Sequence, residues 1–298
     1  MCGIVGLFLK DKSLEPQLGQ MLTDMLITMT DRGPDSAGIA VYGGADDGKG
    51  KITVQSASPD TDFKGLAEAL AKAIGENVSM TVKSTHAVLE MPIAKVEDAR
   101  CALAGLRPGV KVMSAGDALE IYKEVGLPKD VAARFSVQKM AGSHGIGHTR
   151  MATESAVTTM GAHPFSTGPD QCLVHNGSLS NHNNLRRELK RKGMTFETEN
   201  DTEVAAAYLS QKMKEGLNLG EALEQGLKDL DGFYTFVVGT KDGFGVVRDP
   251  IACKPAVMAE TDQYVAFGSE YRAMVNLPGI ETARVWEPEP ATVYFWKH

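Results

Sequence analysis

Cys2 stands second in the chain, ahead of an apolar run from Gly3 to Leu9. If Met1 is removed, Cys2 carries a thiol, which is nucleophilic once deprotonated, and a free α-amine. Such an amine has an ordinary pKa of about 7.7–8.0, so it can take the thiol proton and pass it to a leaving group. The apolar run predicts a buried strand that would hold Cys2 at the edge of a sheet. A cysteine that merely packs in the core is the alternative, and this stretch alone leaves both open.

Further polar groups follow at wide spacing. The segment Gly-His-Thr-Arg lies at 147–150, and His-Asn-Gly at 175–177 ends a short apolar strand. Asn-Gly on its own is typical of a tight turn, and Asp201 is by type an ordinary helix N-cap. Arg32 lies in a Gly-Pro loop, where charges are usually solvated. A strand–helix–turn–strand unit would, however, return Arg32 to the side of Cys2.

The composition excludes several classes of protein. The chain has 298 residues, 43% of them hydrophobic and 23% charged, which fits a globular protein of one large or two small domains. Its net charge of −7 argues against nucleic acid or an anionic membrane as the main partner. No apolar stretch could span a bilayer and no signal peptide is present, so we expect a cytoplasmic protein. The four cysteines form no CxxC pair, which favours reduced thiols and no metal site.

Periodicity predicts the elements of the first part of the chain. Apolar residues at three- and four-residue spacing predict a helix over 15–29, followed by a buried strand at 37–42. A strand is expected at 51–57 and a helix at 62–74, with Asp62 as its N-cap.

A small inserted α/β module is expected at about 79–126. Its predicted elements are a strand at 79–90, a helix at 95–103, a strand at 110–113 and a helix at 115–125. No catalytic grouping lies inside it, so packing or partner contact is its expected role.

The second half of the chain predicts helices and then a β-rich end. Helices are expected at 181–192, 204–214 and 219–230, the first of them with a basic, solvated face. Antiparallel strands are expected at 233–240, 244–247, 256–259, 264–267 and 291–295.

Together, the motifs resemble those of class II glutamine amidotransferases, of the N-terminal nucleophile hydrolase superfamily. The matching segments are Met-Cys-Gly-Ile-Val-Gly at 1–6, Asp-Arg-Gly-Pro-Asp-Ser-Ala-Gly at 31–38, Gly-His-Thr-Arg at 147–150, His-Asn-Gly at 175–177, Asp-Thr-Glu at 201–203, Arg-Asp-Pro at 248–250, Lys-Pro at 254–255 and Ser-Glu at 269–270. Any one motif is weak, but five in the family's order, anchored on a second-position cysteine, are specific. The resemblance covers residues 1–298 apart from an enlarged insertion at about 43–140. It implies an α+β fold, a four-layer αββα sandwich of two antiparallel sheets with helices outside.

The resemblance also implies glutamine hydrolysis and roles for its catalytic residues. Cys2 would attack the side-chain amide carbon of glutamine to form a thioester, with its own α-amine as base and then acid. The Asn176 side-chain amide and the Gly177 N–H would stabilise the oxyanion, and one such donor typically supplies about 3–4 kcal/mol. Arg32 would brace the surroundings of the nucleophile.

The resemblance places five residues in the glutamine pocket. Arg150 would bind the α-carboxylate and Asp201 the α-ammonium group. Thr153 would contribute a hydroxyl, and His148 and Met151 flank the arginine motif. The position of Met151 is often aromatic in the family, which changes the side walls of the pocket.

The resemblance further implies a free-standing glutaminase subunit that passes ammonia to a separate synthase subunit. The chain looks most similar to the glutaminase subunit of glutamate-synthase-like enzymes, including the N-methylglutamate synthase type. Such enzymes carry FMN and iron–sulfur clusters on partner subunits, and this chain has a motif for neither. The alternatives are an amidophosphoribosyltransferase-like glutaminase, an N-terminal nucleophile amide hydrolase without ammonia transfer, and a non-catalytic regulatory subunit.

Overall fold

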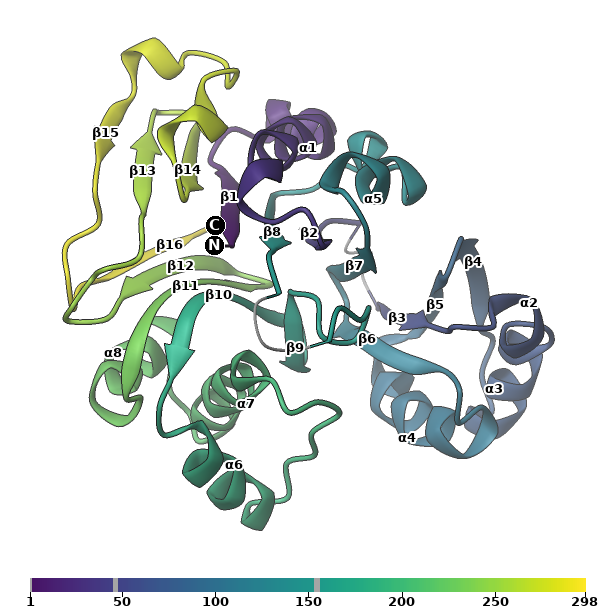
Figure 1. The fold of residues 1–298 in the computed structure, drawn as a ribbon. Helices are drawn as coiled ribbons and strands as arrows, with labels where there is room; N and C mark the ends of the chain where they lie inside the picture. The colour runs from purple at the N-terminus through teal and green to yellow at the C-terminus, as the bar shows by residue number, and fades with distance from the viewer. Residues whose placement is uncertain (1, 45–47, 153–155) are drawn as a thin grey trace.

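Two antiparallel sheets lie face to face in the computed structural model, which describes residues 2–44, 48–152 and 156–298 (Figure 1). Within these residues, the larger sheet runs in the order β15 (Arg284–Trp286), β13 (Val257–Glu260), β14 (Tyr264–Gly268), β1 (Gly3–Leu9), β8 (His144–Arg150), β2 (Ser36–Tyr42) and β7 (Leu119–Val125). The second runs β16 (Val293–Lys297), β12 (Gly243–Arg248), β11 (Gly232–Thr240), β10 (Gln171–Leu179) and β9 (Phe165–Gly168).

Helices cover the outer faces of both sheets (Figure 1). On the larger sheet lie α1 (Leu18–Thr28) and α5 (Pro128–Arg134), and on the other lie α6 (His182–Arg191), α7 (Asp201–Lys214) and α8 (Leu219–Asp229). The 3-10 turns are η1 (Lys12–Gln17), η2 (Thr30–Arg32), η3 (Ile93–Lys95), η4 (Val137–Lys139), η5 (Tyr271–Met274) and η6 (Ile280–Thr282). The expected four-layer αββα sandwich is confirmed.

The apolar run of β1 is explained by burial on both faces. Ile4 and Phe8 pack in the core between the sheets, whereas Val5 and Leu7 pack against α1. Successive side chains of a strand point to opposite faces, so a strand buried on both sides is continuously hydrophobic. The apolar stripe of α1 faces the same outer core.

A second, smaller unit is inserted between β2 and β7 (Figure 1). Its sheet runs in the order β4 (Ser79–Lys83), β5 (His86–Pro92), β3 (Lys49–Gln55) and β6 (Lys111–Gly116). Its helices are α2 (Pro59–Asp62), α3 (Leu66–Ile74) and α4 (Val96–Leu106). We call residues 48–116 the inserted module, and it has an apolar core of its own around Ile52, Leu70, Leu89 and Leu103.

The observed elements of the module differ from the prediction of an α/β unit at about 79–126. Its sheet begins earlier, with β3, and the predicted strand at 79–90 is the hairpin β4–β5. The predicted helix at 115–125 is instead β7 of the larger sheet. Leu119 and Ile121 of β7 pack between the sheets whereas Tyr122 packs on the outer side, so the pattern has the period of a strand.

Smaller differences concern element ends. Asp62 is the last residue of α2, and the N-cap of α3 is Gly65, whose φ of 68° breaks the predicted helix in two. The short strands β9 and β15 were not predicted. In the part of the chain that the structure describes, no helix is both long and apolar enough to cross a membrane.

Candidate active site

The start of the chain is fixed by strands on both sides. Cys2 is half-buried and immediately precedes β1, which pairs with β8 on one side and β14 on the other. Gly3 lies opposite Thr149 of β8, and the Ile4 N–H donates a 2.9 Å hydrogen bond to the Ser269 hydroxyl just beyond β14. Cys2 therefore sits at a defined place at the end of the sheet.

Two side chains from distant segments meet at the backbone of Cys2. Arg32 Nε donates to the Cys2 carbonyl oxygen at 3.0 Å, and Asn176 Nδ2 donates to the same oxygen at 3.3 Å. Arg32 also pairs with Glu270 at 2.6 Å, and this hydrogen bond lowers the pKa of the Glu270 carboxyl. The structure thus brings together Cys2, Arg32 and Asn176.

Asn176 and Gly177 lie within β10, opposite Thr235 and Tyr234 of β11, and do not form the tight turn that the Asn-Gly pair alone suggested. Gly177 has φ 142°, and a Cβ there would lie 1.9 Å from the Phe233 carbonyl oxygen. Only glycine fits such a close approach. Gly177 is exposed whereas Asn176 is 5% exposed, so the strand presents bare backbone next to the amide that contacts Cys2.

Asp201 is tied to the end of β10. Its Oδ2 accepts the Leu179 N–H at 2.9 Å, and its Oδ1 lies 3.6 Å from His175 Nδ1. Burial raises the pKa of Asp201, but these contacts outweigh it and lower the pKa to about 2, so the carboxylate is charged at neutral pH. The N-cap of α7 is Asn200, which accepts the Thr202 N–H at 2.9 Å, and not Asp201. Asp201 therefore has a different task from capping.

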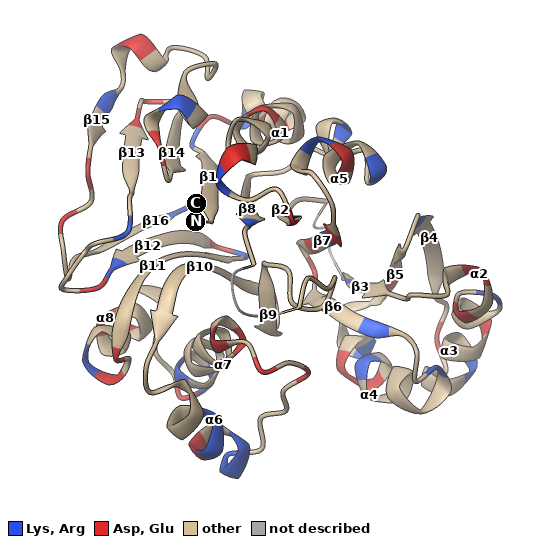
Figure 2. Cartoon of the chain, in the orientation of Figure 1, with Lys and Arg blue, Asp and Glu red and all other residues tan. Residues whose placement is uncertain are grey.

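The basic helix α6 contributes to the position of Asp201. In Figure 2, much of the ribbon of this helix is coloured as Lys and Arg. A solvated face was predicted, yet Arg186 is 5% exposed and donates to the carbonyl oxygens of Thr198 at 3.1 Å and Asn200 at 3.2 Å, besides pairing with Glu199. Arg186 thus holds the segment from which α7 and Asp201 begin.

His148 lies inside the protein and not on an open surface. Its side chain is fully buried in β8, where Nε2 is 3.2 Å from the His175 carbonyl oxygen and the ring stacks on His163 with centroids 4.0 Å apart. Burial lowers its pKa to about 3, so the ring is neutral. His163 in turn contacts the Thr202 hydroxyl at 2.7 Å. Sequence reasoning missed His163 and Thr202, because nothing in a lone His or Thr signals a shared contact.

Arg150 ends β8 with its side chain 8% exposed. Asp35 fixes the chain on both sides of it, since the Asp35 N–H donates to the Arg150 carbonyl at 3.1 Å and the Asp35 carboxylate accepts the Ala152 N–H at 2.8 Å. Met151 is 36% exposed beside it. Thr153, also predicted to contact substrate, lies outside the described residues.

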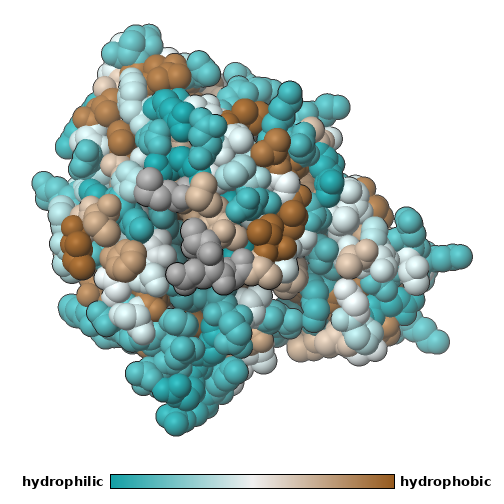
Figure 3. Space-filling view, in the orientation of Figure 1, coloured by the Kyte–Doolittle hydropathy of each residue, from teal (hydrophilic) through white to brown (hydrophobic). Residues whose placement is uncertain are grey.

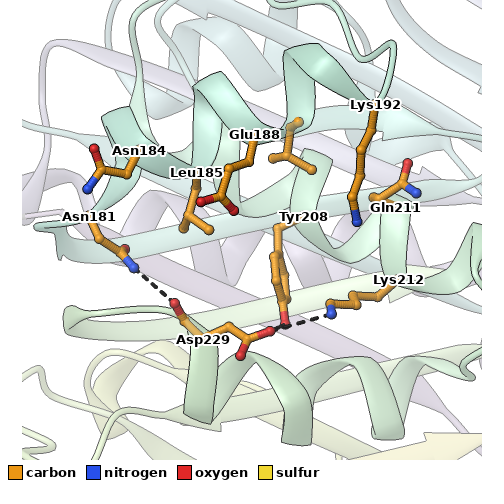
Figure 4. A pocket seen from close by; sticks show the side chains of 10 residues that line it. Asn181, Asn184, Leu185, Glu188, Lys192, Tyr208, Gln211, Lys212 and Asp229 are labelled. Carbon is orange, nitrogen blue, oxygen red and sulfur yellow. Dashed lines mark hydrogen bonds and ion pairs between the residues drawn. The ribbon is translucent and has the colours of Figure 1, made fainter.

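A separate cavity of about 420 Å³ lies among α6, α7 and α8 (Figure 4). Several of its polar groups are paired with one another or with a neighbour: Lys212 and the Tyr208 hydroxyl contact Asp229 at 3.4 and 2.7 Å, and Lys192 contacts Glu215 at 2.8 Å. None of the predicted site residues lines it. Among the described residues, no group of three or more His, Cys, Asp or Glu side chains could hold a metal ion.

Comparison with known proteins gives a consistent family. A profile of the glutamine amidotransferase domain matches residues 148–276. The chain is 74% identical over 298 residues to the glutamine amidotransferase-like protein GlxB of Rhizobium meliloti (strain 1021), covering 100% of this chain and 99% of that protein. It is 33% identical over 167 residues to an amidophosphoribosyltransferase of Methanocaldococcus jannaschii, covering 55% of this chain and 36% of that protein.

A solved structure shares the fold. Glutamine phosphoribosylpyrophosphate amidotransferase from B. subtilis superposes with a TM-score of 0.62 at 20% identity, over 99% of this chain and 47% of that one. The chain therefore spans about half the length of that enzyme, and at this identity the likeness shows the fold alone. Sequence and fold agree, and this chain belongs to the glutamine amidotransferases.

Proposed function

We propose that this chain hydrolyses glutamine to glutamate and ammonia, with Cys2 as the nucleophile once Met1 is removed. The observation that carries the proposal is the meeting of Arg32 and Asn176 at the Cys2 carbonyl oxygen, at 3.0 and 3.3 Å. An oxyanion donor has to lie beside the nucleophile, and Asn176 is the amide side chain found there.

The chemistry would proceed in two halves. The Cys2 α-amine takes the thiol proton, the sulfur bonds to the glutamine amide carbon, and Asn176 and the Gly177 N–H stabilise the oxyanion. The C–N bond then breaks, the same proton goes to the departing ammonia, and a thioester remains. Water adds to the thioester through a second oxyanion, which releases glutamate and returns the thiol.

The two ends of glutamine require opposite charges. We assign the α-carboxylate to the Arg150 guanidinium and the α-ammonium group to Asp201, which the low pKa keeps ionised. Met151 and Thr153 would complete the pocket. His148 would act indirectly, because its ring contacts the His175 carbonyl oxygen and so holds the backbone next to Asn176.

We further propose that the ammonia goes to a separate synthase subunit of the glutamate synthase or N-methylglutamate synthase type, with FMN and iron–sulfur clusters on the partner. Exposed apolar side chains near the site support a docking partner: Met151, Val157 and Phe233 are 36, 40 and 39% exposed. Phe233 pairs with Ser178, one position from Gly177. Figure 3 shows separate hydrophobic patches on the face in view, set among hydrophilic surface.

Two experiments test the reaction. A glutamine-like electrophile should label the native protein at Cys2, located by mass spectrometry, and absence of the label would favour the non-catalytic alternative.

Arg150→Ala should raise the KM for glutamine by about 10²-fold, as expected when a charged hydrogen-bonding partner of a buried ion is lost. Arg100→Ala, an exposed arginine of the inserted module, is the control. If the kinetics of Arg150→Ala were unchanged, the result would favour an amide hydrolase that does not recognise free glutamine.

The partner is tested by purification of the native protein. Recovery with a larger flavoprotein is the expected result. A fully active chain recovered alone would contradict the proposed ammonia transfer and leave the glutaminase assignment standing.

A further inference from the structure

Two consecutive side chains of β7 hold the segment that follows the arginine motif. Residues 156–164 run without regular structure between β8 and β9, and we call them the connecting segment. β7 forms the edge of the larger sheet next to β2 and follows the inserted module directly in the chain.

Lys123 is the first of the two. Its side chain is 3% exposed, and its amino group donates to the carbonyl oxygens of Met160, Ala162 and Pro164 at 3.2, 2.8 and 3.2 Å. An ammonium group has three donors and no acceptor, so three convergent carbonyls match it completely. Burial lowers the pKa of Lys123 to about 7, while the charge of Glu203 favours the protonated form.

The connecting segment also lies directly on the sheet. Gly38 of β2 is paired with Lys123, and a Cβ on Gly38 would come within 2.0 Å of the His163 carbonyl oxygen. The absence of a side chain there lets the backbone of the segment reach the strand. This gives Gly38, the last residue of the motif at 31–38, a physical task.

Glu124 is the second, and it bridges two parts of the molecule. One carboxylate oxygen accepts the Thr159 hydroxyl of the connecting segment. The other accepts the Thr85 hydroxyl at 2.9 Å and lies 3.6 Å from Arg134 of α5. Thr85 belongs to the β4–β5 turn of the inserted module. The module is therefore linked to the segment through a single carboxylate.

The connecting segment reaches both proposed ends of the glutamine pocket. The Ala156 carbonyl oxygen lies 3.4 Å from Arg150 Nη1, and a Cβ on Gly161 would lie 3.4 Å from the same nitrogen. At the other side, His163 contacts the Thr202 hydroxyl, next to Asp201. A shift of the segment would change the surroundings of both residues.

We propose that Lys123 and Glu124 are positioning residues, which fix the connecting segment against Arg150 and Thr202 and couple it, through Thr85, to the inserted module. The proposal rests on the proposed function only for its effect on glutamine. A change in the β4–β5 turn of the module should then alter glutamine binding, although the module contributes none of the proposed site residues.

The sharpest test is Thr85→Val, with Thr81→Val on the exposed strand β4 as the matched control, because it makes the same chemical change in the same hairpin. Loss of one hydrogen bond to a carboxylate should raise the KM for glutamine about 5–10-fold and leave kcat within about twofold. Thr159→Val should have an effect of the same size, and the double variant should not exceed either one by much, because both act through Glu124. Lys123→Met should raise the KM further.

Amide hydrogen exchange in residues 156–164 supplies a readout that needs no glutaminase activity. Exchange should rise in Thr85→Val and Thr159→Val and stay at the native rate in Thr81→Val. Faster exchange in a chain without glutaminase activity would overturn the proposed function and leave the positioning role intact. An active chain in which Thr85→Val matches Thr81→Val in both readouts would overturn the positioning role. Faster exchange with an unchanged KM would overturn the coupling to glutamine binding.

Discussion

The candidate active site and the inserted module use polar side chains in opposite ways. At the site, Arg32, Asn176 and Asp201 are largely buried and each has a defined partner across the fold. In the module, ion pairs such as Arg100–Glu97 lie on the surface of a single helix, and most buried residues are apolar, although the buried Lys51 pairs with Glu120 of β7 at 3.0 Å. Burying a polar group is costly unless it is paired, so paired burial concentrated in one region indicates where function has constrained the sequence.

The largest expected effect lies at Cys2, the proposed nucleophile. Cys2→Ala should reduce ammonia release from glutamine by more than about 10³-fold with little change in stability, since the thiol is half-buried at the chain start. Cys101→Ala, an exposed cysteine of the module, should leave the rate unchanged. A Cys2 variant that keeps its activity would remove the distinction between the two regions.

The oxyanion donor comes next. Asn176→Ala should lower kcat by about 10²–10³-fold with a smaller change in KM, because the interaction is needed only in the tetrahedral states. Asn184→Ala, at the rim of the cavity among α6, α7 and α8, is the control. Equal effects of the two variants on kcat would contradict the placement of the oxyanion at β10.

The separate core of the module predicts separate unfolding. Leu70→Ala should destabilise the module by about 2–5 kcal/mol and add an early transition in calorimetry. Ile146→Ala, between the main sheets, should shift the principal transition instead. One transition that both variants shift equally would mean that module and sandwich unfold as one unit.

The smallest effect concerns the acid stability that Asp201 provides. Its pKa falls from 3.8 to about 2 on folding, so it stabilises the fold by about 2 kcal/mol above pH 3.8 and loses this as the pH drops through about 2. Asp201→Asn should therefore be less stable than the native protein at neutral pH, and the difference should vanish in strong acid. Denaturant unfolding across this range measures it. A constant difference would point to lost packing and not to charge.

The sequence was informative where chemistry demands particular residues at particular places. The motifs single out Cys2, Arg32 and Asn176, which lie together in the structure, and the apolar run predicts a strand that is buried on both faces, as β1 is. The sequence was less informative at residues 115–125, whose mixture of charged and apolar residues fits the periodicity of a helix as well as that of a strand. There the pairing of β7 with β2 decides for a strand.

Contacts made by residues that lie outside the motifs could not be predicted. Two examples depend on the tertiary fold: the hydrogen bond from Arg186 to the backbone before α7, and the stacking of His163 on His148. No local pattern marks such residues. His163 was left without a role, and the helix that contains Arg186 was predicted to have a solvated basic face. The tight turn suggested by Asn176-Gly177 alone was wrong for a related reason. Glycine tolerates a positive φ in a strand, as at Gly177, as well as in a turn.

The central place of β1 has a consequence for biosynthesis. Cys2, the proposed nucleophile, is made before the strands that flank it, since its own strand pairs on one side with β8 and on the other with β14, and the Ile4 N–H is bound by Ser269. While a ribosome is still translating the residues before Tyr264, one edge of β1 has no neighbour. The nascent polypeptide thus carries a cysteine whose setting is completed only after Ser269 has been made, and a product terminated before that residue would lack it.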